Sequence, residues 1–140
     1  MYPAQHAATS GAAALLAALY LQLSPLTAAV WAIAGIAAGV LVDVDHVVLA
    51  VLLHGRWDAA RTWIRQPVTA VLDPEAFLED IDPAADLRGA RILSHAAVLG
   101  AALLAVGRIP LATPVAVALS VHILVDIAWD VRETGGLPYL

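Results

Sequence analysis

Residues 40–55 read VLVDVDHVVLAVLLHG, an apolar segment of helical length that carries four ionisable side chains. Asp43, Asp45 and His46 fall within one turn of a helix, and His54 follows about two turns later. An unpaired charge in such surroundings is costly in free energy. These side chains therefore need partners from elsewhere in the chain, or a bound cation.

The whole chain is apolar. Hydrophobic residues make up 61% of its 140 residues, charged residues only 14%, and the mean hydropathy is +0.83. A soluble domain of this length could not bury so much apolar surface, so an integral membrane protein with membrane lipid as its partner is predicted. The net charge of −5 argues against nucleic acid as a partner, because no large basic surface is available to neutralise phosphates.

Four apolar segments are candidates for membrane-spanning helices, which need about 20 residues each. They cover residues 7–23, 26–54, 92–106 and 111–128. The dipeptide Ser24-Pro25 separates the first pair and Pro110 interrupts the second, so each pair is expected to form an antiparallel hairpin. The prediction is an all-α fold: a four-span bundle of two hairpins that forms one integral membrane domain over residues 1–140.

The polar segment 55–91 between the hairpins is predicted to be an interfacial, cytoplasmic loop. Two Asp-Pro pairs, at residues 73–74 and 82–83, each resemble an N-cap followed by proline at the first helical position, which predicts two short helices. Upstream, Trp57 and Trp63 alternate with arginines, a mixture typical of a segment in the lipid headgroup region.

Residues 35–39 read GIAAG, with two glycines four positions apart in the second segment. This spacing puts both glycines on one helix face, where a neighbouring helix can approach closely. A helix rich in Ala and Gly produces the same letters by chance, so the pattern predicts a tightly packed bundle and nothing more.

The arginines predict the orientation. If both chain ends lie on the same side as segment 55–91, that side holds every arginine except Arg108. Because basic residues are retained on the cytoplasmic side, both termini are predicted to be cytoplasmic.

Two hairpins bring the ionisable residues of all four segments to this cytoplasmic end, where they form a candidate metal site. The predicted metal ligands are His6, Asp43, His46, His95, His122 and Asp126. His122 and Asp126 are four residues apart and share a helix face, as do Asp43 and His46, which are three apart. Such side chains on facing helices are typical of metal sites in bundles. The chain has no cysteine, so zinc held by His and Asp is predicted, as one or two ions, with manganese or iron as alternatives.

Three further ionisable residues are less clearly placed. Asp45 points roughly opposite to Asp43 on a regular helix, so it joins the site only if the helix loosens there, and otherwise orients a ligand histidine. His54 would lie about 12 Å beyond His46 on a continuous helix and is interpreted as an interfacial residue. Asp130 is expected to be solvated.

Short elements with ionisable residues are distributed over nearly the whole chain. They are His6, VDVDH at residues 42–46, RILSH ending at His95, and HILVD at 122–126 followed by TGGLPY at 134–139. Together they resemble the membrane-bound metal-dependent hydrolases of bacterial and archaeal inner membranes. The His and Asp content is also similar, more distantly, to that of the zinc-dependent phospholipase C group. The resemblance implies a hydrolase with a bound metal in a prokaryotic inner membrane.

The chain departs from the family pattern at three positions. Val42 stands where proline is usual, Ala90 where the third element begins with histidine, and Ala96 where that element has serine. The loss of one histidine puts a full family set of metal ligands in doubt.

A site at headgroup depth predicts metal-assisted hydrolysis of a phosphoester in a lipid headgroup. Asp45 would act as general base or orient a ligand, and Arg91, one turn before His95, would bind the phosphate. One alternative is a non-enzymatic four-span protein whose metal fixes the bundle or passes ions. Another is haem held by paired histidines, against which the neighbouring carboxylates argue.

Overall fold

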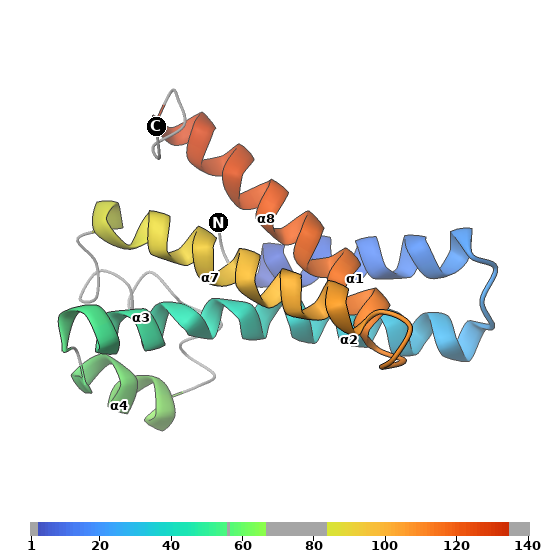
Figure 1. Cartoon of the computed structure of the whole chain (residues 1–140), viewed down its shortest axis with the longest axis horizontal. Helices are drawn as coiled ribbons and strands as arrows, with labels where there is room; N and C mark the ends of the chain where they lie inside the picture. The colour runs from blue at the N-terminus through green and yellow to red at the C-terminus, as the bar shows by residue number, and fades with distance from the viewer. Residues whose placement is uncertain (1–2, 56, 67–83, 135–140) are drawn as a thin grey trace.

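The computed structural model describes residues 3–55, 57–66 and 84–134, and every regular element in these ranges is a helix (Figure 1). In chain order the elements are α1 (Pro3–Tyr20), α2 (Pro25–Leu41), the 3₁₀ turn η1 (Val42–Val44), α3 (Asp45–His54), α4 (Trp57–Arg65), α7 (Ala84–Ala105) and α8 (Ala112–Thr134). The predicted all-α class is confirmed for this part of the chain.

Helices α1 and α2 form the first predicted hairpin and lie side by side (Figure 1). Ser24 caps α2, since its side-chain oxygen accepts a hydrogen bond from the backbone N–H of Thr27 at 3.2 Å. Pro25 occupies the first helical position, where the N–H that it lacks would have no partner in the helix. Helix α2, η1 and α3 then follow one another without a break, so the predicted segment 26–54 is helical along its length.

Glycines set the distance between α1 and α2. A Cβ atom at Gly39 would lie 2.5 Å from Ser10 Oγ and 2.9 Å from the His6 carbonyl oxygen, and one at Gly35 would lie 2.7 Å from the Ser10 carbonyl oxygen. No side chain larger than hydrogen fits such contacts without moving a backbone. The close packing predicted from GIAAG is therefore confirmed at this helix pair.

The second hairpin differs from its prediction at its start. Helix α7 begins at Ala84, whereas the predicted segment began at residue 92, so the expected short helix after residues 82–83 is instead the first part of α7. No proline interrupts the chain between Ala84 and His95, and Gly89 alone disfavours a helix there, so the helix continues.

The segment between the hairpins is described only in part. Its first part forms α4, which packs against α3. The Asp-Pro pairs at residues 73–74 and 82–83 lie outside the described residues.

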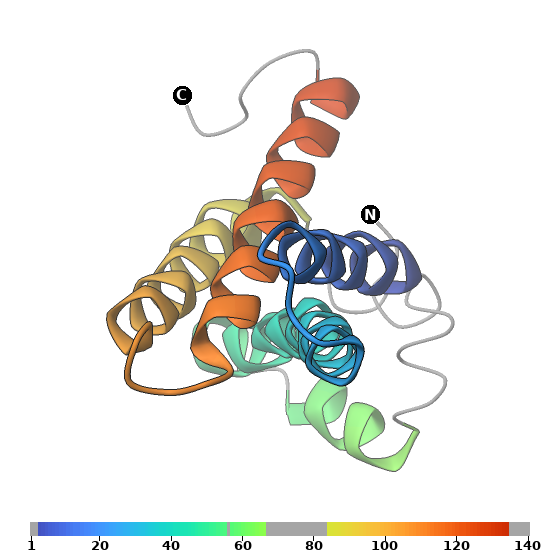
Figure 2. The ribbon, with the colours of Figure 1, turned by 90° about the vertical axis from the view of Figure 1, so that its right-hand side faces the viewer.

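Helix α8 is the central element of the bundle. It packs against α1, α2 and α7 and crosses them obliquely, as the two views show (Figures 1 and 2). Small side chains permit this crossing: Ala118 is fully buried, and its carbonyl oxygen accepts a hydrogen bond of 3.5 Å from the buried Ser10 Oγ of α1.

Within the described ranges, two helical runs are long and apolar enough to cross a membrane: Pro25–Leu49, of 25 residues, and Ala112–Arg132, of 21 residues. Helix α1 has only 18 residues, and its first two turns are polar. The apolar part of α7 is the shorter run Gly89–Ala105. The other two crossings of the four-span prediction therefore stay a prediction.

Replacing Gly39 with alanine should loosen the α1–α2 pair. We expect Gly39→Ala to lower the free energy of unfolding by about 1–3 kcal/mol, because the new methyl group overpacks a backbone contact. The matched control is Gly100→Ala in α7, where a Cβ meets no atom within 4 Å. That change should be neutral or stabilise the helix by about 0.5–1 kcal/mol. Denaturant unfolding in detergent measures both, and equal stability of the two variants would contradict the account.

Candidate metal centre

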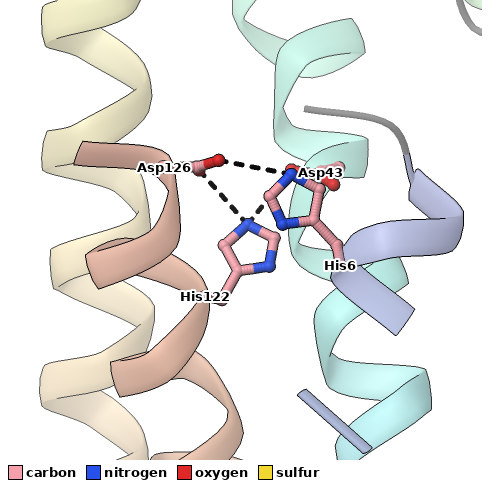
Figure 3. A group of neighbouring side chains, drawn as sticks. All are labelled: His6, Asp43, His122 and Asp126. Carbon is pink, nitrogen blue, oxygen red and sulfur yellow. Dashed lines mark ion pairs between the residues drawn. The ribbon is translucent and has the colours of Figure 1, made fainter. Parts of the chain in front are cut away.

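Four ionisable side chains from three segments meet in the middle of the bundle (Figure 3). His6 comes from α1, Asp43 from η1, and His122 and Asp126 from α8. One nitrogen or oxygen atom of each lies within 4.8 Å of the corresponding atoms of the others. This group could hold a metal ion.

The separations match those expected between ligands of one ion. His6 Nε2 lies 3.2 Å from Asp126 Oδ1, and His122 Nε2 lies 3.4 Å from Asp126 Oδ2 and 3.3 Å from Asp43 Oδ1. Two ligand atoms about 2.1 Å from a tetrahedral ion are about 3.4 Å apart. Only small movements are needed for these atoms to share an ion.

His95 of α7 adds a third imidazole to the group. Its Nε2 atom lies 3.5 Å from Asp43 Oδ1 and 3.8 Å from Asp126 Oδ2. The Nε2 atoms of His95 and His122 therefore face both carboxylates, and that of His6 faces Asp126. The rings of His6 and His122 are also stacked, with centroids 4.0 Å apart. The arrangement offers three nitrogen and two carboxylate donors.

The site is buried and contains two carboxylates. His6, His95, His122 and Asp126 are each at most 4% exposed, and the side chain of Asp43 is 19% exposed. Two carboxylates in an apolar bundle repel each other strongly, and a divalent cation between them would offset both charges. The donor set fits zinc, manganese or iron, all of which accept imidazole and carboxylate ligands.

The surroundings of His122 indicate whether the site fits a metal ion. Its Nε2 atom is buried and makes no hydrogen bond within the described part of the chain, although it faces two carboxylates. A buried polar atom without a hydrogen bond is costly. A metal ion at this point would give that nitrogen a partner.

The 3₁₀ turn places Asp43 and Asp45 on the two edges of one histidine ring. Successive residues rotate by about 100° in an α-helix and about 120° in a 3₁₀ helix, so the turn brings the two side chains from about 160° apart to about 120°. Asp43 Oδ1 faces Nε2 of His95, while Asp45 Oδ2 lies 2.8 Å from Nδ1. The helix tightens at this point, so the loosening that would let Asp45 join the metal site does not occur.

The structure brings five of the six predicted ligands together. The sixth, His46, is in α3 one turn beyond Asp43, but its side chain lies outside the described residues, as does that of His54. The expected position at the end of the bundle needs correction: His95 and His122 lie about halfway along α7 and α8, because both helices extend well beyond the site. Metal binding by these residues stays a prediction.

Asp130 is placed differently from its prediction. It is 6% exposed, and its Oδ2 accepts a hydrogen bond of 3.0 Å from the Arg91 guanidinium. Asp130 is one turn beyond Asp126 on α8, and Arg91 is one turn before His95 on α7, so the ion pair forms a second polar layer beside the site. These two spacings were available in the sequence, but the third segment was expected to begin at residue 92 and the fourth to end at residue 128, so neither Arg91 nor Asp130 was placed inside a helix.

Ser94 was part of the predicted third element, but no role was assigned to it. Its hydroxyl hydrogen-bonds to Asp45 Oδ2 and lies 2.7 Å from the carbonyl oxygen of Arg91. Ser94 therefore connects α7 to the start of α3, beside the ring of His95.

Comparison of the chain with models of known protein families, with curated protein sequences and with solved structures found no match. The resemblance to the membrane-bound metal-dependent hydrolases thus rests on the short elements in the sequence.

A bound divalent ion should stabilise the fold. With free Zn²⁺ at 100 times its Kd, the free energy of unfolding should rise by about 2.7 kcal/mol, seen as a higher Tm in detergent. Asp43→Asn should remove this rise, because it deletes one of the two charges that offset the cation.

The control for this measurement is Ser120→Ala, also a partly buried polar position, whose hydroxyl bonds only locally to the Ala116 carbonyl oxygen at 2.8 Å. It should retain the wild-type response to Zn²⁺. An equal response of wild type and Asp43→Asn would contradict the ligand assignment.

Proposed function

We propose that this chain is a four-span protein of a prokaryotic inner membrane that binds a divalent metal ion, with zinc as the leading candidate, and hydrolyses a phosphoester of a lipid or lipid-like substrate. The observation that carries the proposal is the convergence of three histidine Nε2 atoms on the carboxylates of Asp43 and Asp126 inside an apolar bundle. A divalent cation between these groups would offset both carboxylate charges.

The outer surface of the bundle supports membrane insertion. Large apolar side chains are exposed on each long helix, including Leu16 of α1 at 65%, Ile33 of α2 at 66%, Leu104 of α7 at 77% and Leu124 of α8 at 65%. Exposure of these side chains to lipid would carry no free-energy cost, whereas their exposure to water would be unfavourable. The surface thus favours crossings by α1 and α7 beside the two longer apolar runs.

Helix α4 supports an interfacial position for the segment after α3. Trp57 and Ile64, seven residues apart, share one face and are both well exposed, while Arg61 and Arg65 share a neighbouring face. Aromatic and apolar side chains beside arginines are typical of helices at the headgroup level. With the basic residues on this side, the segment and both termini would be cytoplasmic.

The proposed chemistry divides between the ion and the chain. The metal would supply a water molecule with a lowered pKa and polarise the phosphoryl group. His6, His95 and His122 would hold the ion through Nε2, and Asp43 and Asp126 would balance its charge. Arg91 would bind the phosphate through its guanidinium, which also donates a hydrogen bond to Asp130.

A second function is favoured by the burial of the ligands. Four of the five are at most 4% exposed, and five protein ligands leave few positions for water. A closed site of this kind would fix the four helices together, or handle ions, without turnover. Only the hydrolase converts a substrate, so an activity assay distinguishes the two functions.

A turnover screen tests the hydrolase. Purified full-length chain is assayed on phospholipid vesicles that differ in headgroup, before and after removal of metal by chelation and with Zn²⁺, Mn²⁺ or Fe²⁺ restored. We expect metal-dependent release of a phosphorylated headgroup or of phosphate, with Asp43→Ala at background. Stabilisation by metal without turnover on any headgroup would favour the structural site instead.

The orientation can be tested by labelling, because the chain has no native cysteine. Arg108→Cys lies in the turn between α7 and α8, and Gln66→Cys directly follows α4. In intact spheroplasts a membrane-impermeant maleimide should label only Cys introduced at position 108, and position 66 only after permeabilisation. Labelling of both positions from one side would contradict the proposed topology.

A further inference from the structure

His95 is held at both edges of its ring by carboxylates from one short stretch of chain. Asp43 Oδ1 lies 3.5 Å from Nε2, and Asp45 Oδ2 lies 2.8 Å from Nδ1. The ring is 1% exposed, so water does not compete for these contacts. We propose that Asp45 is a positioning residue, which fixes the proton of His95 on Nδ1 and so makes Nε2 a metal ligand. This inference rests on the metal site of the proposed function.

The proton on a neutral imidazole resides on one nitrogen, and a hydrogen bond to a carboxylate decides which. With Nδ1–H donated to Asp45, the lone pair of Nε2 points at Asp43 and Asp126, where the ion would bind. A carboxylate in this position also raises the basicity of the opposite nitrogen and holds the ring plane. Asp45 would thus strengthen metal binding by His95 without binding the ion itself.

The same geometry argues against Asp45 as general base. The imidazole ring stands between the Asp45 carboxylate and the two carboxylates of the site, so Asp45 faces the far edge of a ligand and not the position of a bound water. Its Oδ2 atom also accepts a hydrogen bond from Ser94. Two groups of α7, the Ser94 hydroxyl and the His95 ring, therefore hold this oxygen in place. Of the two roles that the sequence left open, the orienting role is the one that the contacts favour.

The other two histidines are held differently. Within the described residues, the Nδ1 atoms of His6 and His122 are buried and make no hydrogen bond. His95 is thus the imidazole of the three that a described carboxylate orients. Loss of Asp45 should act on a single ligand, and loss of such a partner typically reduces metal affinity by 10- to 100-fold.

The experiment compares Zn²⁺ affinity of the full-length chain in detergent, measured by chelator competition. Asp45→Asn keeps the shape of the side chain and removes its charge, and we expect Kd to rise about 10- to 100-fold. Asp45→Glu should recover part of the affinity, because it restores a carboxylate. Ser120→Ala, whose hydroxyl bonds only within α8, should bind Zn²⁺ as the wild type does. Far-UV circular dichroism and size-exclusion chromatography establish that each variant is folded.

A second readout does not depend on affinity. Nitrogen-15 NMR of histidine-labelled apoprotein, recorded at a pH at which the His95 ring is neutral, reports which ring nitrogen carries the proton, and the resonances of His95 are assigned with His95→Gln. The wild type should show Nδ1–H for His95, and Asp45→Asn should lose that preference. This spectrum also decides the matter if Asp45→Asn binds too little Zn²⁺ to measure.

The outcomes separate the two proposals. A wild-type chain that binds no Zn²⁺ overturns the metal site and this inference with it. Wild-type affinity and an unchanged His95 tautomer in Asp45→Asn overturn the positioning role and leave the metal site standing. Loss of turnover in Asp45→Asn at unchanged Zn²⁺ affinity would also overturn it, since that result identifies a base.

Discussion

Two carboxylates buried among apolar helices need compensation for their charge, and the rest of the structure is arranged around them. Asp43 and Asp126 lie within reach of the same three imidazoles, and at 4% exposure Asp126 has little access to water. Two buried carboxylate charges without compensation would be strongly destabilising in a bundle of this kind. A divalent cation would satisfy both the carboxylates and the buried histidine nitrogens. A metal site would therefore explain why so apolar a chain keeps ionisable residues in its interior.

The packing of the helices serves this arrangement. Gly39 lets α1 approach α2 so closely that the backbone of His6 lies against it, and this contact holds the His6 ring near Asp43. Helix α8 crosses both helices over small residues and brings His122 and Asp126 to the same point. The Arg91–Asp130 pair ties α8 to α7 one turn away. Each helix of the bundle thus contributes a contact that fixes the distance between ligands.

Much of the fold and of the site could be predicted from the sequence. The Ser24-Pro25 break predicted the first hairpin, and the spacing of His122 and Asp126 predicted a shared face. Both depend on local chemistry, which a single sequence shows directly. The glycines of GIAAG predicted close packing but could not say against which helix.

Other features depend on contacts between distant segments and could not be predicted. The continuity of α7 from Ala84 into the apolar segment was missed, because a separate short helix was expected after residues 82–83, and the burial of Asp130 against this helix was missed with it. The 3₁₀ turn Val42–Val44 leaves no sequence pattern of its own, and the contacts of Asp43 and Asp45 with the ring of His95 join segments that lie far apart in the sequence. The number of membrane crossings is equally hard to predict from the sequence, because α1 has only 18 residues and several of its first residues are polar.

The metal content of the purified chain tests the central claim most directly. Elemental analysis of the wild type and of an Asp43→Asn/Asp126→Asn double variant, both monodisperse in the same detergent, would measure it. We expect about one equivalent or more of a divalent transition metal per wild-type chain and a large loss in the double variant. A wild-type chain that is folded, monodisperse and free of metal, and that takes up none when Zn²⁺, Mn²⁺ or Fe²⁺ is supplied, would contradict it.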